Sequence, residues 1–540
     1  MIKKKYQWAQ SGDINAFFGL MLDNVAGLAL LVYLLSEFGF PVDFAIAYMV
    51  PGTAIGVLVG DLLFFFLAFW YAKKTGNSDV TAMPLGLDTP STFGMALFVL
   101  GPAYAAATEG GMSQEAAAMH TWHIGMCAIL ITGVIKAVLS FFSGWIHRVV
   151  PRAGLLGSLA AIALVLITFE PLTQIAKTAP IVGFASLALV LVTLIGKQRL
   201  PAGIPGALAA VVVGTAIYYL LLGIGSVNDM ELVERPASSA INFLPLEWLE
   251  AFKFEWLGKF SHTIPYLGFV VPFAVATVIG GIDCTESAAS VGDEFHTPTV
   301  IGVEAFATLL AACCGGVIQT TPYIGHPAYK AMGGRAAYTL ATALFIGAAG
   351  ILGFFSLMFV YIPKAAIFPI LIFIGVEITA SSFQVTKKKH YAAIAMACLP
   401  AIAKLVVLNI TPYVVEMGFT FKDPDLAKSW LYANVLAGGF IFTSLIWAAA
   451  TAKMIDRKYL SAGIFLALGG VFTLFGIMHS PLAGDRMFLP TDMANEEIFD
   501  PARIAAVRDF AVSYFVMAAI MIGLWLTLPE SKLPEKSDTH

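Results

Sequence analysis

Two short segments, MPLGLDTPST at residues 83–92 and QTTPYIGHP at residues 319–327, interrupt long apolar stretches with proline, glycine and hydroxyl side chains. They fall at corresponding places in two halves of the chain. Irregular backbone at membrane depth is tolerated only around a protein-lined cavity. Paired breaks of this kind predict a transporter with two inverted repeats and a binding site near the bilayer midplane. A pair of ordinary proline kinks is the alternative interpretation.

The composition around the two breaks is that of a membrane protein. The chain has 540 residues, of which 59% are hydrophobic and 12% are charged, and its formal net charge is −4. Soluble and disordered chains do not have this composition. Without a basic tract, binding of nucleic acid is excluded. The five cysteines lie in apolar stretches and are expected to be core residues. No removable signal peptide is expected, because the basic N-terminus lacks a cleavage site.

Apolar segments of about 20 residues, the length that crosses a bilayer, occur about sixteen times. The longest polar insertion follows the seventh segment, which favours an all-α polytopic fold of two inverted seven-span repeats, with about two extra C-terminal spans. Lysine and arginine are distributed so that both termini are expected in the cytoplasm, with the protein in the plasma (inner) membrane. The predicted parts are a first repeat at 1–223, an external loop at 224–263, a second repeat at 264–452, and extra spans with a tail at 453–540.

The eighth expected span carries the strongest candidate site. Asp283, Glu286, Ser287 and Ser290 are spaced i, i+3, i+4 and i+7, so they share one helix face. Carboxylates inside a span are costly and need a partner, a wet cavity or a function. We expect Asp283 to bind substrate and to carry a proton, with Glu286 as a second candidate for both roles. Glu286 near the cytoplasmic end is alternatively a solvated side chain.

Two further acids fall in the first and third expected spans. Asp23 lies on a face of small residues and is expected either to couple protons or to make a structural hydrogen bond. Asp88 and Thr89 lie in the first break, where free helix amides favour an anionic or carbonyl group. Asp88 is alternatively the N-cap of the half-helix that follows.

The second break contains Tyr323 and His326. The tyrosine ring is expected to stack on a planar base, and the histidine to donate a hydrogen bond or move a proton. A buried histidine with ordinary hydrogen bonds is the alternative. Lys136 and Lys404 lie inside spans, where they are expected to snorkel or to pair with one of the single acids in or near spans. Those single acids are Asp61, Glu170, Glu304 and Glu377, for which no functional role is expected.

With these residues assembled, the chain resembles the nucleobase/ascorbate transporter superfamily of the uracil-permease fold, as a divergent subgroup nearest to the hypoxanthine/adenine/guanine permease branch. The resemblance implies core and gate domains, short antiparallel strands in spans three and ten, and a base bound between spans one, three, eight and ten. It also implies proton coupling. The family's base-binding acid falls on Asp283, and the polar residue one turn later falls on Ser287.

The tenth-span pattern of the family matches Thr320-Thr321-Pro322-Tyr323 through Gly333-Gly334-Arg335. This implies that Thr321 and Tyr323 bind substrate. The second acid that relatives carry in this span is absent, and Gly325 or His326 takes its place. The fold therefore transfers more safely than the substrate.

The main hypothesis is proton-coupled uptake of a purine or related nucleobase by alternating access. The alternative is a small-anion transporter of the same fold, similar to the sulfate permease family, which the loss of the span-ten acid and the inward-pointing half-helix ends would favour. A membrane-embedded hydrolase is disfavoured, because no HisGluXXHis or comparable cluster occurs. We expect no enzyme activity, no cofactor and no metal site. The expected partners are a nucleobase-like small molecule, a proton or sodium ion, the lipid bilayer and a second copy of the chain in a homodimer.

Overall fold

The computed structural model describes residues 6–201, 204–225, 241–416, 423–482, 485–495 and 499–528. Within these ranges the chain is helical apart from one two-stranded sheet. Ten described helices are long and apolar enough to cross a membrane, or up to twelve if each of two bent helix pairs is one span. Three shorter apolar helices and the broken segment at residues 320–331 correspond to the remaining predicted segments. The predicted all-helical, multi-pass fold is therefore confirmed.

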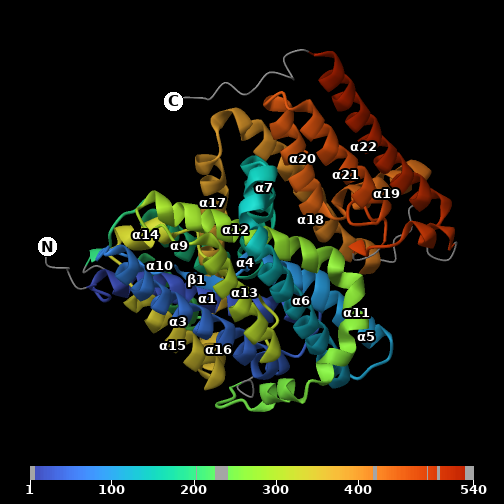
Figure 1. Ribbon diagram of the computed structural model, residues 1–540. Coiled ribbons are helices and arrows are strands. Elements are labelled where there is room, and N and C mark those ends of the chain that lie inside the picture. Colours follow the sequence, from blue (N-terminus) through green and yellow to red (C-terminus); the bar gives the residue numbers. More distant parts are fainter. Residues whose placement is uncertain are drawn as a thin grey trace. The chain divides into compact units, whose positions relative to one another are not determined.

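The helices separate into two compact units, and unit 1 comprises residues 1–144 and 166–376. It contains both sequence breaks (Figure 1). Its main elements are α1 (Gly12–Ser36), α3 (Val50–Thr75), β1 (Leu85–Leu87), α4 (Thr89–Gly94), α5 (Gly101–Glu109), α6 (Gln114–Val149), α8 (Glu170–Thr178), α9 (Pro180–Val190), α10 (Gly206–Gly223), α12 (Leu267–Ser290), α13 (Thr297–Cys313), β2 (Thr320–Pro322), α14 (His326–Ala331), α15 (Ala337–Ile351), α16 (Phe354–Tyr361) and the first part of α17 (Lys364–Val385). Short helices join them: α2 (Val42–Phe44), η1 (Ala45–Met49), η2 (Met95–Leu100), η4 (Leu191–Ile195), η7 (Glu247–Lys253), η8 (Glu255–Lys259), α11 (Phe260–Thr263) and η9 (Ile264–Tyr266).

Unit 2 comprises residues 145–165 and 377–540. Its described elements are α7 (Arg152–Ile162), the end of α17, η10 (Lys388–His390), α18 (Tyr391–Glu416), α19 (Pro424–Ala437), α20 (Phe440–Ile455), α21 (Tyr459–Leu474), η12 (Pro490–Ala494) and α22 (Pro501–Thr527). The predicted repeat and domain limits stay predictions. Part of the predicted external loop, 226–240, and the tail from 529 lie outside the described residues.

The two breaks meet as the strands β1 and β2. The strands are antiparallel, with Leu85 opposite Pro322 and Leu87 opposite Thr320. The backbone amide of Asp88 extends the pairing by donating to the carbonyl of Gln319 at 3.0 Å. Equivalent segments that pair antiparallel run through the protein in opposite directions, as an inverted repeat requires. The predicted short strands in spans three and ten are confirmed.

A two-stranded sheet in an apolar interior leaves backbone groups on its outer edges, and neighbouring helices satisfy them. Along β1, the amides of Leu85 and Leu87 donate to Asp61 Oδ1 and Asn24 Oδ1, at 3.2 and 3.0 Å. Along β2, three side chains bind the backbone: Thr308 accepts from the amide of Thr320, Lys136 donates to the Thr320 carbonyl, and Cys284 donates to the Pro322 carbonyl. These contacts fix the strand pair within unit 1.

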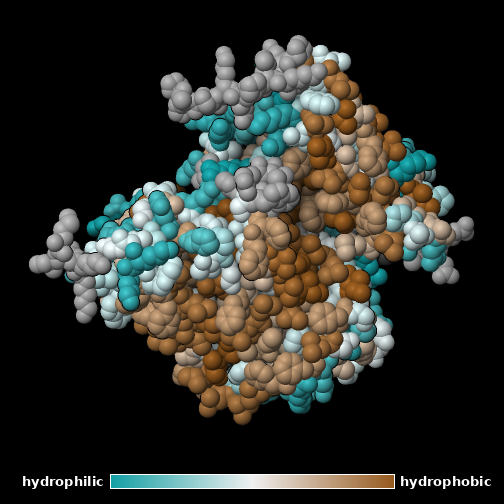
Figure 2. All heavy atoms as spheres, viewed as in Figure 1, coloured by the Kyte–Doolittle hydropathy of each residue, from teal (hydrophilic) through white to brown (hydrophobic). Residues whose placement is uncertain are grey.

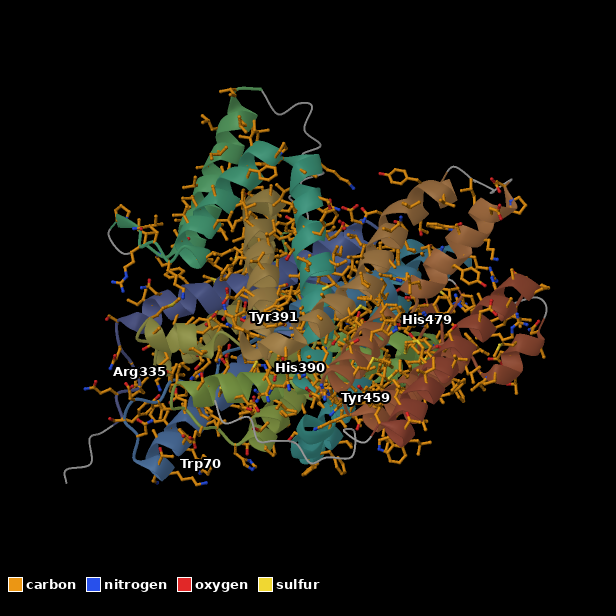
Figure 3. All side chains as sticks on the ribbon, turned by 90° about the horizontal axis from the view of Figure 1, so that it is seen from above. Trp70, Arg335, His390, Tyr391, Tyr459 and His479 are labelled. Carbon is orange, nitrogen blue, oxygen red and sulfur yellow. The ribbon has the colours of Figure 1, made fainter. Side chains whose placement is uncertain are left out.

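The last two helices of unit 2 are joined to α20 by a buried polar chain. His479, in the connection after α21 (labelled in Figure 3), donates through Nδ1 to the Val435 carbonyl at 3.1 Å. Its Nε2 therefore accepts from the Tyr514 hydroxyl at 2.8 Å, and that oxygen accepts from the Trp447 indole at 2.6 Å. Burial lowers the pKa of His479 to about 4, in keeping with a neutral ring. The extra C-terminal helices are thus packed and hydrogen-bonded within unit 2.

Apolar side chains also cover the outside of unit 1. Figure 2 shows hydrophobic residues dominating the face of this unit over α3, α15 and α16. Phe66 on α3 and Leu344 on α15 are 61% and 56% exposed. Large apolar side chains at this exposure are costly in water and favourable against lipid tails. The exposed surface therefore agrees with a membrane-embedded unit.

Candidate substrate and coupling site

The first break positions Asp88 at the start of a helical run, Thr89–Glu109, that is long enough to cross a membrane. Asp88 is the N-cap of α4, and its Oδ2 accepts from the amide of Ser91 at 3.1 Å. The prediction of an N-cap role is confirmed. Asp88 and Thr89 are 6% and 4% exposed, so both predicted substrate residues are buried beside β1.

Gln319 links this cap to α12 in the other half of the chain. Its Nε2 donates to Asp88 Oδ2 at 3.1 Å, and its Oε1 accepts from the Thr277 hydroxyl at 3.1 Å. A hydrogen-bonded chain thus runs from α12 through the start of β2 to the first turn of α4. Gln319 was not among the predicted site residues, although it is the first residue of the second break. The sequence signal that could have identified it is a polar amide side chain directly before a buried strand.

A narrow cavity adjoins this chain of hydrogen bonds. Its volume is about 10 Å³, which is room on the order of one water molecule. Ser91 and Gln319 provide polar groups, and the rest of the wall is mostly apolar. The lining residues come from α4 and η2 (Ser91, Gly94, Met95, Val99), α6 (Ile129, Thr132), α12 (Phe269, Val270, Phe273) and the approach to β2 (Gln319).

The polar face predicted for the eighth span lies on α12, away from this cavity lining. Asp283 is 6% exposed, and Glu286 is more exposed toward the end of the helix. The Ser287 hydroxyl donates to the Ile324 carbonyl at 3.0 Å. A Cβ atom added at Gly280, one turn before Asp283, would meet no atom within 4 Å. This face of α12 therefore retains open space beside Asp283 within unit 1.

The other predicted substrate residues lie on and just after β2. Thr321 is opposite Gly86 in the strand pair. Tyr323 is partly buried and approaches the Tyr329 ring edge-on, with centroids 6.4 Å apart. Gly325 precedes α14 as its N-cap residue, and His326 begins that helix. Within this segment, the Ile324 carbonyl accepts from Ser287. None of these predicted residues lines the cavity beside Ser91.

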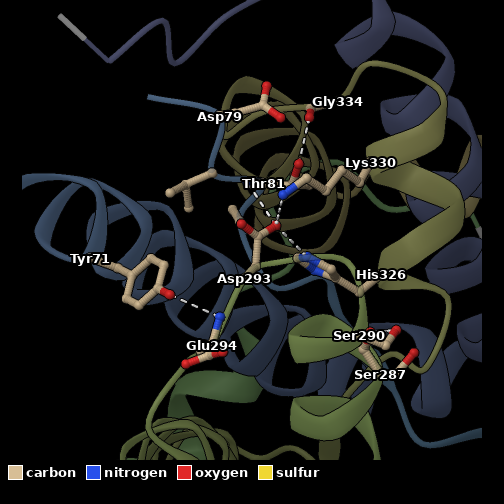
Figure 4. A network of polar contacts seen from close by, with 12 residues as sticks. Tyr71, Asp79, Thr81, Ser287, Ser290, Asp293, Glu294, His326, Lys330 and Gly334 are labelled. Atoms are coloured by element: carbon tan, nitrogen blue, oxygen red, sulfur yellow. Dashed lines mark hydrogen bonds and ion pairs between the residues drawn. The ribbon is translucent and has the colours of Figure 1, made fainter. Parts of the chain in front are cut away.

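His326 is bound to a carboxylate that the sequence did not single out. Its Nε2 lies 2.9 Å from Asp293 Oδ2, and both side chains are fully buried. The same oxygen accepts from Lys330 Nζ at 2.8 Å and from the Thr81 amide at 3.2 Å (Figure 4). His326 is thus held in place by hydrogen bonding, as the structural alternative predicted. Asp293 was missed because a polar turn between two spans gives no sign of what it contacts.

The other charged residues predicted within spans are Lys136, Lys404 and Asp23. Lys136 Nζ is 2.6 Å from Glu304 Oε1, with both side chains fully buried, so the predicted pairing of this lysine is confirmed. Lys404 pairs with Asp485 at 2.7 Å, a partner that was not predicted. Asp23 is 5% exposed, and neither of its carboxylate oxygens has a hydrogen-bond partner among the described residues. The structural hydrogen bond expected as its alternative role is therefore not found there.

Comparison with known proteins finds the fold among solved structures. No family model and no curated protein sequence matches the chain. The structure of SLC26A9 aligns over 75% of this chain at 13% identity and a TM-score of 0.48, and this chain covers 65% of that one. The transmembrane domain of a cyanobacterium bicarbonate transporter, BicA, aligns over 73% of this chain and 97% of its own, at 15% identity and a TM-score of 0.44. Murine SLC26A9, an anion transporter in the inward-facing state, aligns over 78% and 71%, at 14% identity and a TM-score of 0.48.

These similar structures correct the family that the sequence suggested. They are anion and bicarbonate transporters, so the predicted membership of the nucleobase/ascorbate transporter superfamily is wrong. The predicted purine uptake and xanthine/uracil permease activity are wrong for the same reason. The motif of a span-eight acid followed by a broken span ten reflects a shared way of building broken spans, and it does not specify the substrate. The chain itself is a multi-pass integral membrane protein, with ten to twelve described helices or helix pairs that are long and apolar enough to cross a membrane.

Proposed function

We propose that this protein is a secondary transporter of a small inorganic anion. The observation that most supports this is the narrow cavity beside the first turn of the helix Thr89–Glu109, where Ser91 and Gln319 provide the polar groups. The N-terminal end of a helix carries partial positive charge and favours anions. In this conformation the Ser91 hydroxyl donates to the Asp88 carbonyl, and the Gln319 amide donates to the Asp88 carboxylate. We propose that both donors turn to the anion when it enters, and that without a fixed positive charge they hold it weakly enough to release.

The size of the cavity favours a small ion over a heterocycle. At about 10 Å³, it would have to widen far more for a planar base than for an ion of a few atoms. Phe269 and Phe273 line the cavity with aromatic rings. Their side chains have no groups that could form hydrogen bonds with the N–H and carbonyl groups of a base.

The carboxylates near the strands support cation coupling. Asp88 is a buried acid that binds the cavity residue Gln319, and an anion entering beside it would be repelled unless positive charge accompanied it. Cotransport of a proton or sodium ion meets this requirement. Asp283, Glu286 and Asp23 remain the proposed coupling residues, and Thr321, Tyr323 and Ser287 remain proposed substrate contacts.

The remaining features of this proposal follow from the sequence. We propose that the chain is a transporter and not an enzyme, that it works in the plasma (inner) membrane, and that both termini are cytoplasmic because of the distribution of lysine and arginine. A homodimer is the proposed assembly.

Uptake into proteoliposomes tests the proposal. Purified protein would be reconstituted, and uptake of labelled bicarbonate, sulfate, chloride and formate compared with that of adenine and uracil, with and without inward proton and sodium gradients. We expect uptake of at least one small anion, stimulated by one of the two gradients, and none of the bases.

Two variants with the same substitution locate the site. Gln319→Leu removes the amide from the cavity and is expected to lower anion uptake at least tenfold. Gln198→Leu changes an exposed loop residue and should leave uptake unchanged. Uptake of a base but of no anion, or equal uptake by both variants, would overturn the proposed function.

A further inference from the structure

Asp23 on α1 is a buried acid in contact with the first strand. It is 5% exposed, and both of its carboxylate oxygens lack a hydrogen-bond partner among the described residues. A Cβ atom added at Gly86 of β1 would lie 3.4 Å from Asp23 Oδ2. The carboxylate therefore lies against the backbone of the strand.

Asp61 on α3 approaches the same strand. Its side chain is fully buried, and its Oδ1 accepts from the Leu85 amide at 3.2 Å. Its second oxygen, Oδ2, has no hydrogen-bond partner in the described parts of the chain. Asp23 and Asp61 thus reach adjacent residues of β1 from two different helices.

Tyr329 on α14, in the second broken span, packs against α1 close to Asp23. Its ring lies 3.6 Å from the position of a Cβ atom at Gly19, one turn before Asp23. The two acids are therefore placed where the two halves of the fold meet.

No ion pair among the described residues balances the charge of this region. Lys136 pairs with Glu304 and Lys330 pairs with Asp293, so the basic groups nearest to the strands are already engaged. An isolated ionised carboxylate in an apolar interior is far more costly than a neutral acid. At least one of the two acids must therefore bind a cation in this conformation.

We propose that Asp23 and Asp61 form a proton-binding site, and that its proton is the coupling ion of transport. The coupling role rests on the proposed function, whereas the bound proton does not. A carboxylate takes up one proton from the water on one side of the membrane and becomes a carboxylic acid. It returns to the carboxylate when it releases that proton on the other side.

The position of Asp61 explains how the proton would affect the substrate site. An ionised carboxylate accepts a hydrogen bond more strongly than a neutral acid. Loss of the proton would therefore strengthen the hydrogen bond that the Leu85 amide donates to Asp61. Asp88, the N-cap beside the cavity, follows β1 directly in the chain. A shift of the Leu85 backbone would therefore be passed along three residues to the first turn of α4.

Infrared spectroscopy of the purified full-length protein tests for the proton directly. A protonated carboxyl group has a carbonyl stretching band distinct from that of a carboxylate. We expect this band at neutral pH in the wild type, and a smaller band in both Asp23→Asn and Asp61→Asn. The matched control is Asp509→Asn on α22, because the exposed Asp509 pairs with Arg508 and should not contribute to the band. Absence of the band in the wild type, or equal bands in all the variants, would disprove proton binding here.

A transport measurement tests the coupling role. In proteoliposomes, Asp61→Asn is expected to abolish proton movement during anion uptake while anion exchange across the membrane continues. If the wild type moves no anion under any gradient, the proposed function fails, and the infrared result still decides whether the pair binds a proton. Uptake that depends on sodium and moves no protons would overturn the identity of the coupling ion.

Discussion

The two strand-bearing spans perform the same structural task with different chemistry. Each strand has one edge paired with the other strand and one edge facing helices. On β1, the outer amides bind Asn24 and Asp61. Asn24 is neutral, whereas Asp61 is an acid with no ion-pair partner in the described parts of the chain.

On β2, the outer groups bind neutral or paired side chains. Thr308 accepts from the Thr320 amide, and Lys136, which donates to the Thr320 carbonyl, is neutralised by Glu304. The other residue of β2 on this edge is Pro322, which has no N–H group that needs a hydrogen-bond acceptor. The charges around β2 are therefore balanced within the protein.

The difference shows that a carboxylate is not needed to hold a buried strand. Asn24 and Thr308 perform this task without charge. Asp61 and its neighbour Asp23 add a charge that the fold does not require. This excess charge is the reason to assign proton binding to Asp23 and Asp61 beside β1, and a structural role to the Lys136–Glu304 pair beside β2.

The largest expected effect comes from breaking the charge balance around β2. Lys136→Met leaves Glu304 buried without its partner and should lower the free energy of unfolding by about 3–5 kcal/mol. The double variant Lys136→Met/Glu304→Gln should recover most of this loss. Thermal unfolding in detergent measures both. If the double variant is as unstable as the single variant, the pair is not what stabilises β2.

A smaller loss of stability is expected from removing Asp293, a carboxylate that accepts hydrogen bonds from both halves of the chain. Asp293→Ala removes the acceptor for Thr81, which precedes β1, and for His326 and Lys330 on α14. We expect a loss of about 2–3 kcal/mol, since several buried donors lose their partner. Hydrogen exchange measured by mass spectrometry should also increase at both strands. Faster exchange at only one strand would mean that Asp293 holds one half of the fold alone.

The neutral supports of the two strands should be equivalent. Asn24→Leu and Thr308→Val each remove one acceptor from a buried strand amide, so each should cost about 1–3 kcal/mol of unfolding free energy. Chemical unfolding of the two variants side by side measures the difference. Costs that differ by more than about 2 kcal/mol would show that the strands are not supported in the same way.

The smallest effect on stability is expected at the acid with the proposed coupling role. In Asp61→Asn, the amide oxygen still accepts from the Leu85 amide, so the unfolding free energy should change by less than about 1 kcal/mol. The pH dependence of uptake should nevertheless be lost. A large loss of stability with normal pH dependence would make Asp61 a structural residue like Asn24.

Local patterns in the sequence were sufficient for the spans and for the place of the breaks. Apolar length predicts a bilayer span, and proline with glycine at 83–92 and 319–327 predicts an interruption, because both are local properties of the backbone. The N-cap role of Asp88 is local as well, since cap and amide are three residues apart. The family and the substrate were not predictable in this way, because a shared pattern of broken spans is compatible with more than one ligand.

Only the tertiary structure decided which buried charges are balanced. Lys136 and Glu304 are 168 positions apart in the sequence, and the contacts of Asp293 with Thr81 span 212 positions. No period or motif relates such residues, so their pairing depends on how the helices pack around the strands. The sequence by itself determined that acids lie within the membrane. Packing determined that Glu304 and Asp293 have basic partners, whereas Asp23 and Asp61 have none among the described residues.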